Sequence, residues 1–149
     1  MTNTERFSDR VDNYQKFRPS YTDETINYII GNFGLSKDSV IADIGSGTGI
    51  FTEKLLANFK FVYAVEPNQE MRIAAYKRLS SFKSYKSING TSEVTTLNAK
   101  SLNGITVAQA FHWFNIEKTR EEFRRVLKDE AFVFLIWNNR ISNTPFLRA

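Results

Sequence analysis

Apolar and polar positions along the chain follow two different repeats, which alternate from one segment to the next. Short runs rich in β-branched and other apolar residues predict buried strands, and apolar residues spaced three and four apart predict amphipathic helices. Strands are predicted at 40–44, 61–66, 84–89, 104–111 and 131–137. Helices are predicted at 22–33, 50–59, 69–82 and 116–129, with a further short helix opening at 91–93. This alternation predicts an α/β protein with a doubly wound, mostly parallel sheet.

The clearest local signal is the sequence VIADIGSGTG at 40–49. A short buried strand carries a carboxylate at Asp43 and runs into a loop in which three glycines alternate with hydroxyl residues. Glycine lets such a loop turn sharply and brings the backbone close to a ligand, because no Cβ intervenes. A strand, a glycine loop and a helix together predict the nucleotide-binding start of a doubly wound fold. The dinucleotide fingerprint would need its third glycine at Ile50, which argues against a nicotinamide cofactor.

The next predicted strand ends in a carboxylate, Glu66, which lies 21 positions after Gly45. This is about the separation between the glycine loop and the ribose-binding acid in this kind of fold. A carboxylate can accept hydrogen bonds from both ribose hydroxyls, and the end of a strand places it in the ligand crevice. Asn68 also has a structural interpretation, because it is a candidate N-cap of the helix that follows.

Composition narrows the class of protein. A chain of 149 residues is long enough for one domain with a sizeable core. It contains no cysteine and one histidine, which excludes disulfides, a cysteine-built zinc site and a multi-histidine metal centre. Its polar N-terminus has no secretory signal, and no apolar run approaches the roughly 18 residues of a membrane span. We therefore expect a soluble cytoplasmic protein with no metal and no membrane partner.

The net charge of +4 permits an anionic substrate or a nucleic acid without demanding either, because the basic residues are scattered. The densest basic stretch, 120–128, alternates with Glu121, Glu122 and apolar residues. That pattern is typical of the solvated face of a helix rather than of a nucleic-acid patch. We expect no nucleic-acid partner.

The D-x-G-x-G-x-G pattern that begins at Asp43 resembles motif I of the class I S-adenosylmethionine-dependent methyltransferases. The resemblance implies a Rossmann-like methyltransferase core and S-adenosyl-L-methionine as the cofactor. It also implies that Asp43 organises the loop and the cofactor's ammonium group. The loop residues that would wrap the methionine and ribose end are Gly45, Ser46, Gly47 and Gly49.

Three further segments resemble the same family. The run EPNQEM resembles its E-P-x-x-x-M segment, in which the residue after proline and the methionine line the adenine. The run GTSE resembles its G-x-A-E segment, with serine in place of alanine. The run AQAFHWF, at the carboxyl end of the predicted fourth strand, matches the family closely. The residues that these segments add to the implied cofactor site are Glu66, Pro67, Asn68, Met71, Ser92, Glu93, Gln109 and Ala110.

The same resemblance places His112 and Trp113 at the acceptor pocket, with His112 as the candidate catalytic residue. The roles of packing residue, pocket residue and general base stay open for this histidine, because many methyl transfers depend on alignment and need no base. Trp113 has the simpler alternative of shaping an apolar wall.

The N-terminal segment 1–21 resembles the lid of small-molecule methyltransferases related to the trans-aconitate and ubiquinone-biosynthesis enzymes. This implies that Tyr14, Arg18 and Tyr21 come close to the cofactor or the substrate, where a guanidinium could hold a carboxylate. The alternative is an aromatic-anchored arm that packs on the surface of the domain.

These observations predict a methyltransferase, or its N-terminal portion, that acts on a small molecule. Lys16, Arg18 and the net charge suggest an acidic acceptor. The family fold has seven strands, so we expect residues 1–149 to be one C-terminally incomplete domain whose fifth strand is an exposed edge. The alternatives are a catalytically inactive cofactor-binding module that self-associates through that strand, and a nicotinamide-dependent oxidoreductase. Base methylation is disfavoured, because no Asp-Pro-Pro-Tyr or Asn-Pro-Pro-Tyr sequence follows the fourth strand.

Overall fold

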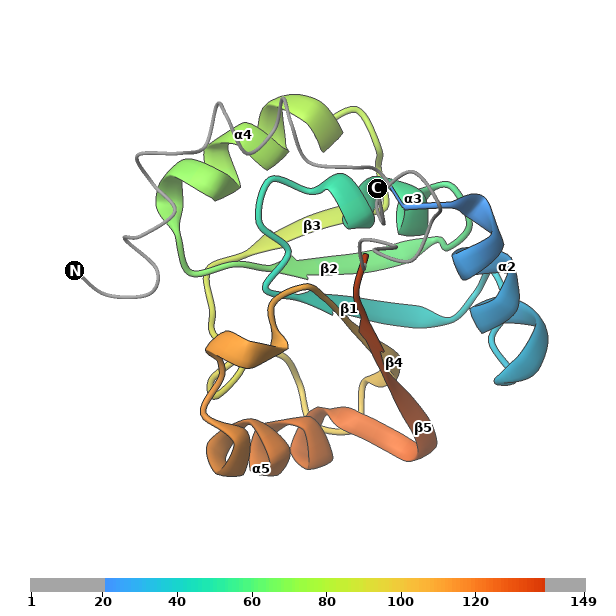
Figure 1. Cartoon of the computed structure of the whole chain (residues 1–149), viewed down its shortest axis with the longest axis vertical. Helices are drawn as coiled ribbons and strands as arrows, with labels where there is room; N and C mark the ends of the chain where they lie inside the picture. Colours follow the sequence, from blue (N-terminus) through green and yellow to red (C-terminus); the bar gives the residue numbers. More distant parts are fainter. Residues whose placement is uncertain (1–20, 139–149) are drawn as a thin grey trace, which may run out of the picture.

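The computed structural model describes residues 21–138, so the predicted lid residues Tyr14 and Arg18 lie outside the described part of the chain. Helices and strands alternate along it, as Figure 1 shows. Their bounds are α2 Asp23–Asn32, β1 Val40–Ile44, α3 Ile50–Leu56, β2 Phe61–Val65, α4 Gln69–Leu79, β3 Tyr85–Ile88, β4 Leu102–Ala108, a 3-10 turn at Phe111–Trp113, α5 Ile116–Val126 and β5 Leu127–Ile136. The predicted α/β class is confirmed.

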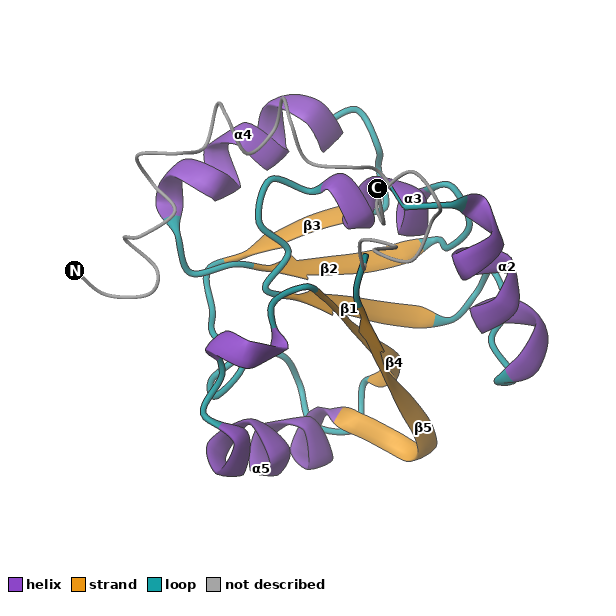
Figure 2. Ribbon diagram, in the orientation of Figure 1, coloured by secondary structure: helices purple, strands orange, loops and turns teal. Residues whose placement is uncertain are grey.

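The five strands form one parallel sheet in the order β3-β2-β1-β4-β5 (Figure 2). The chain builds outward from β1 through β2 to β3, and then returns to the other side of β1 for β4 and β5. The strand order therefore reverses between β1 and β4, and ligands bind at this switch point in open α/β sheets. No helix among residues 21–138 is long and apolar enough to cross a membrane.

Both faces of the sheet are covered. One core cluster joins the sheet to α2 and α3 and includes Ile41 and Leu55. The other joins it to α5 and includes Ile105, Phe123 and Val126. Each fully buried aliphatic side chain of this kind stabilises the fold by about 1.5–3 kcal/mol. Figure 1 shows α4 and α5 at opposite ends of the view, with the sheet between them.

The predicted helix opening at 91–93 does not form, so this prediction was wrong. Residues 89–101 are irregular, and Thr96 has a left-handed backbone with φ of 67°. The Thr91 hydroxyl accepts a hydrogen bond from the backbone N–H of Val94, as a helix cap would, but the turn does not continue. The backbone N–H of Thr95 instead donates to Glu122 on α5, and this tertiary contact overrides local propensity.

The predicted fourth strand was too long at its carboxyl end. β4 stops at Ala108, because Gln109 adopts a left-handed backbone with φ of 56°. The backbone N–H of Gln109 still donates to the Ile136 carbonyl at 2.8 Å, which anchors this turn to the end of β5. Residues 109–111 therefore leave the sheet and enter a short turn at its carboxyl edge.

Strand β5 pairs with β4 and has no second neighbour among the described residues. Its apolar side chains are partly exposed, and they include Phe132, Val133 and Leu135. Phe132 and Phe134 each contact the Phe33 ring edge-to-face at 5.0 Å, so part of this surface packs under the end of α2. The predicted edge position of the fifth strand is confirmed for residues 21–138, and self-association through it stays a prediction.

Candidate cofactor site

A cavity of about 130 Å³ opens at the carboxyl edge of the sheet, at the point where the strand order reverses. Its lining comes from four segments, each at the end of a strand: Gly45 and Gly47 after β1; Glu66, Pro67, Asn68 and Met71 after β2; Thr91, Ser92 and Glu93 after β3; and Ala108, Gln109, Ala110, Trp113 and Phe114 at the end of β4. The topology therefore brings together segments that are far apart in the sequence.

The loop after β1 lies against the walls of the cavity. Gly45 has a left-handed φ of 70°, and a Cβ on it would lie 2.7 Å from the Ala110 Cβ and 3.3 Å from the Phe114 ring. The backbone N–H groups of Gly45 and Ser46 both donate to the Val65 carbonyl, at 2.9 and 3.2 Å. Only glycine fits this position, because any side chain would clash and strain the backbone.

Gly49 has a different environment, although it belongs to the same predicted motif. A Cβ on Gly49 would lie 2.6 Å from the Leu79 Cδ1 and 3.3 Å from the Ala75 Cβ, both on α4. Gly49 does not line the cavity. The structure therefore places this glycine at a close contact between the loop and a helix.

Asp43 is fully buried behind the loop and joins three elements. Its carboxylate accepts hydrogen bonds from the Thr52 hydroxyl on α3 at 2.7 Å and from the Thr106 hydroxyl on β4 at 3.0 Å. Burial raises the pKa of Asp43 to about 6, and the two hydroxyl groups only partly oppose this. The loop-organising part of its predicted role fits these contacts.

Asp43 and Ser46 line a second, smaller hollow rather than the main cavity. Its other lining residues include Tyr21 and Thr48, and its volume of about 10 Å³ is close to that needed for one water molecule. The Thr48 hydroxyl is buried, and it has no hydrogen-bond partner within residues 21–138. Of the three predicted lid residues, the structure describes only Tyr21, which packs edge-to-face on Phe51 at 4.9 Å.

Glu66 follows the last residue of β2 and lies in the cavity wall with 8% of its surface exposed. Burial raises its pKa from 4.5 to about 7, although the backbone N–H groups of Asn68 and Gly47 and the charge of Arg72 act in the opposite direction. Arg72 does not pair with the carboxylate. Its guanidinium donates instead to the carbonyl oxygens of Glu66 and Pro67, at 2.9 and 2.7 Å.

The start of α4 confirms Asn68 as its N-cap. The Asn68 side-chain oxygen accepts a hydrogen bond from the backbone N–H of Met71 at 2.9 Å. Both residues also line the cavity, and Met71 is 2% exposed overall. The structural and cofactor-binding interpretations of Asn68 are therefore compatible.

The wall formed by Ser92 and Glu93 is held from α5. The Ser92 hydroxyl lies 2.8 Å from the Thr119 hydroxyl, and Glu93 accepts a hydrogen bond from the backbone N–H of Asn115 at 2.9 Å. Both residues line the cavity, as predicted.

The segment after β4 separates two residues that the sequence had placed together. Trp113 lines the cavity, whereas His112 is exposed and does not line it. The two rings are in tilted contact, with their centroids 4.7 Å apart, so His112 lies on the solvent side of the cavity-lining Trp113. The structure does not bring His112 to the cavity, and a catalytic role for it stays a prediction.

Sequence reasoning missed three lining residues, Thr91, Ala108 and Phe114. Each lies next to, or inside, a segment that had been singled out. The motif identified the segment, but the direction of each side chain depends on the irregular backbone at 91–93 and 109–114. Sequence reasoning also missed Thr52 and Thr106. One lies on a helix and the other on a strand, and nothing in the sequence indicates that both donate to the buried Asp43 carboxylate.

Comparison with known proteins identifies the family. Residues 42–135, well over half of the chain, match the family described as Methyltransferase domain. The chain belongs to this family. It is 31% identical over 142 residues to an uncharacterized methyltransferase-like protein of Schizosaccharomyces pombe, covering 95% of this chain and 54% of that protein. It is 30% identical over 142 residues to an uncharacterized methyltransferase of Mycobacterium tuberculosis, covering 95% of this chain and 56% of that protein.

The fold is shared with solved structures. The crystal structure of a SAM-dependent methyltransferase from Aquifex aeolicus superposes with a TM-score of 0.73 at 21% identity, covering 97% of this chain and 79% of that one. The chain spans about half the length of the curated relatives named above. S-adenosylmethionine is the cofactor of this family.

The residues at the cavity fit a ligand that carries a ribose and a positively charged group. Glu66 is an acceptor-only carboxylate whose burial holds its pKa high, and no Lys or Arg in the described ranges is ion-paired with it. Gly45 lets the loop backbone reach the cavity wall, because a Cβ at this position would clash with Ala110 and Phe114. Hydroxyl donors and positive charge on a ligand stabilise the ionised form of such a buried carboxylate, which favours binding of that ligand.

Proposed function

We propose that the chain binds S-adenosylmethionine in this cavity and transfers its methyl group to a small-molecule acceptor. One observation carries the proposal: Glu66, a buried carboxylate with a raised pKa, lies in the cavity wall beside the glycine loop, where the Gly47 backbone N–H donates to it. The family match supports methyl transfer, and it does not favour the alternative of an inactive module. The activity of the whole protein remains part of this proposal.

The proposed binding residues act in distinct ways. Glu66 accepts hydrogen bonds from the two ribose hydroxyls, and the Gly45 backbone approaches the ligand closely. Asp43 acts from behind, because its bonds to Thr52 and Thr106 fix the loop relative to β4. The remaining residues that we assign to the cofactor are those that line the cavity and were predicted from the sequence: Gly47, Pro67, Asn68, Met71, Ser92, Glu93, Gln109 and Ala110.

When bound, the cofactor supplies an electrophilic methyl group on a sulfonium. The chain's own contribution is to hold the donor in one orientation and to exclude water from one side with Trp113 and Phe114. Orientation alone accounts for a large part of the acceleration in reactions of this type, so no general base is assigned. The support for an acidic acceptor is Lys16, Arg18 and the net charge of +4.

Calorimetric titration with S-adenosylhomocysteine, the demethylated cofactor, tests this proposal. We expect saturable one-site binding, and a loss of about 100-fold in affinity for Glu66→Ala, because two hydrogen bonds to a charged acceptor disappear. Glu70→Ala is the matched control, since Glu70 lies four residues further on in the first turn of α4, is exposed and does not line the cavity. NAD is titrated in parallel, and it should not bind.

Two results would overturn the proposal. A folded wild-type chain that fails to bind S-adenosylhomocysteine would remove the cofactor. Binding that is equally strong in Glu66→Ala and Glu70→Ala would place the ligand somewhere other than this cavity.

A further inference from the structure

One wall of the cavity has little structure of its own. Thr91, Ser92 and Glu93 belong to an irregular segment, residues 90–101, that connects β3 to β4. Among the described residues, its only internal backbone–backbone hydrogen bond joins Thr91 to Val94, at 3.0 Å. A segment with so few internal bonds depends on its neighbours for its shape.

The neighbour is α5, and the contacts follow one stripe of it. The partners of the segment on or just before this helix are Asn115, Thr119, Glu122, Arg125 and Val126, of which the first four are spaced by four, three and three residues. Residues at such spacings lie on one face of a helix. The segment is thus fastened along the helix, with the cavity-lining residues at the N-terminal end of the stripe.

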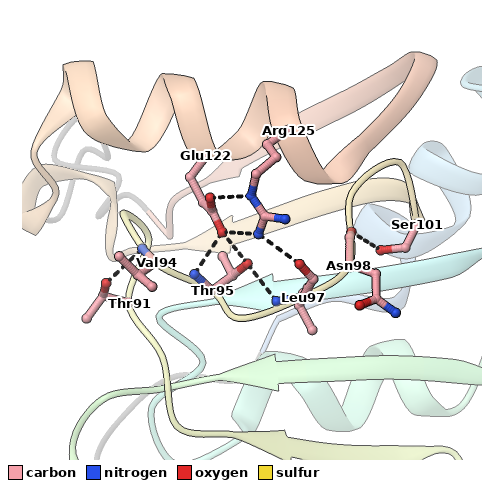
Figure 3. Close-up of polar contacts among 8 residues, drawn as sticks. All are labelled: Thr91, Val94, Thr95, Leu97, Asn98, Ser101, Glu122 and Arg125. Carbon is pink, nitrogen blue, oxygen red and sulfur yellow. Dashed lines mark hydrogen bonds and ion pairs between the residues drawn. The ribbon is translucent and has the colours of Figure 1, made fainter.

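Glu122 and Arg125 form the most extensively bonded part of the stripe (Figure 3). One oxygen of the Glu122 carboxylate accepts from the Thr95 N–H at 2.9 Å, from the Thr95 hydroxyl at 2.6 Å and from Arg125 at 2.7 Å. The other accepts from the Arg125 Nε at 2.8 Å. Arg125 also donates to the Leu97 carbonyl at 2.8 Å, so the pair holds the segment on both sides of residue 96.

Residue 96 is the point of strain. Thr96 has a φ of 67°, in the left-handed region that a β-branched residue almost never adopts. Backbone strain of this kind persists only where the surroundings impose it. The flanking bonds, from the Thr95 N–H to Glu122 and from Arg125 to the Leu97 carbonyl, supply that constraint.

We propose that Glu122 and Arg125 are positioning residues of the cofactor site, which set the place of Ser92 and Glu93 in the cavity wall. Neither residue lines the cavity, so they act through the segment that they hold. The inference rests on the proposed function, since it assumes that the ligand of this cavity is the cofactor. Without the pair, the segment samples other conformations, and only a fraction of molecules presents a complete wall.

Two conservative variants test the inference: Glu122→Gln removes the charge, and Arg125→Lys removes the planar fork of donors. The matched controls are Glu121→Gln and Arg124→Lys, which change exposed neighbours on the same helix. S-adenosylhomocysteine affinity is measured by calorimetry at a temperature where melting curves show every variant fully folded. We expect Kd to rise about tenfold in the two test variants, because about one molecule in ten would hold the segment in its binding conformation. In the controls Kd should rise less than about twofold.

Hydrogen exchange supplies a readout that a uniform loss of stability would not move. We expect faster exchange confined to residues 90–101 in Glu122→Gln, with β1 and β2 unchanged, and protection restored by saturating S-adenosylhomocysteine. A lower melting temperature with an unchanged Kd and no local change in exchange would overturn the inference and leave the proposed function standing. A wild-type chain that does not bind S-adenosylhomocysteine would remove the proposed function itself.

Discussion

Glu66 and Glu122 have nearly the same exposure, 8% and 9%, but their surroundings shift their pKa values in opposite directions. Glu66 lies at the cavity without an ion-pair partner among the described residues, and burial raises its pKa to about 7. Glu122 lies on α5 against Arg125, and the hydrogen bonds from that guanidinium lower its pKa to about 2. Solvent exposure alone therefore does not determine the charge state of a carboxylate in this protein.

The comparison separates two uses of a buried acid. An ionised carboxylate that is buried without a partner destabilises the ligand-free protein. Such a residue is typical of a functional site, where a bound ligand offsets the desolvation cost. A carboxylate that is paired and fully hydrogen-bonded instead fixes the geometry around it. Asp43 lies between the two, because its partners are hydroxyl groups rather than a cation.

The largest effect expected from the difference between the two pKa values is a pH dependence of cofactor affinity. Ribose hydroxyls donate to the ionised form of Glu66, whose pKa of about 7 means that it is mostly protonated below neutrality. Affinity for S-adenosylhomocysteine should therefore rise with pH and level off above about 7, with Kd roughly thirtyfold weaker at pH 5.5 than at pH 8. Calorimetric titration with S-adenosylhomocysteine across this pH range, in wild-type protein and in Glu66→Gln, measures the dependence of Kd on pH.

The Glu66→Gln variant isolates the contribution of this carboxylate. Asp43 has a pKa of about 6 and titrates in the same range, so any slope left in the variant belongs to Asp43. An equal pH dependence in both proteins would contradict the assignment to Glu66.

The next effect is on stability, and it should have opposite signs at the two glutamates. For Glu66 the folded pKa lies above the unfolded value near 4.5, so its ionisation lowers stability as pH rises from 4.5 through 7. Replacing it with Gln should stabilise the ligand-free protein at pH 8 by about 1.5 kcal/mol. This is roughly half of the free energy that corresponds to the full pKa shift on folding. The remainder is lost because the hydrogen bonds from the backbone amides of Gly47 and Asn68 weaken when Gln replaces the carboxylate. Urea unfolding at pH 8 and pH 4 measures the difference, which should vanish at pH 4.

Glu122 provides the opposing case. Its folded pKa lies below the unfolded value, so its contribution is present above about 4.5 and is lost as pH falls toward 2. Glu122→Gln should destabilise the protein at pH 8 by about 1 kcal/mol, a figure reduced because the Arg125 side chain is 43% exposed. Effects of the same sign at both residues would break the comparison.

The smallest effect is expected at the ion pair between Lys100 and Asp129. It joins the end of the 90–101 segment to β5 at 3.0 Å, but its side chains are 60% and 92% exposed. Asp129→Asn should change the free energy of unfolding by less than about 0.5 kcal/mol in urea unfolding, because water and salt screen an exposed pair. A larger change would mean that the segment is also held at this end by charge.

The sequence predicted the parts of the fold and site that depend on local pattern. The β1 strand, its glycine loop and the carboxylate at the end of β2 follow from β-branched runs, glycine spacing and fold-level separation, and the structure places Gly45 and Glu66 on one cavity. Asn68 was identified as an N-cap for the same reason, since capping depends on residues only three apart.

Features that depend on contacts distant in sequence were not predicted. Hydropathy counts Glu122 and Arg125 as polar residues of a solvated helix face. Glu122 is nevertheless buried, because it bonds to Thr95, 27 positions away. The same contact explains why the helix expected at 91–93 does not form. His112 and Trp113 are adjacent in the sequence, and only the 3-10 turn determines that one ring lines the cavity while the other is exposed.

The fastening of residues 90–101 along α5 has a consequence for how this protein can diverge. The shape of the segment is imposed mainly by side chains on the helix, so evolution can change the exposed positions Val94, Thr96 and Asn98 with little selective pressure from the cavity. Glycine at position 96 would even remove a strained conformation. Selection would act instead on Glu122 and Arg125. These two residues would be conserved or replaced as a pair, because losing either leaves the other without its partner.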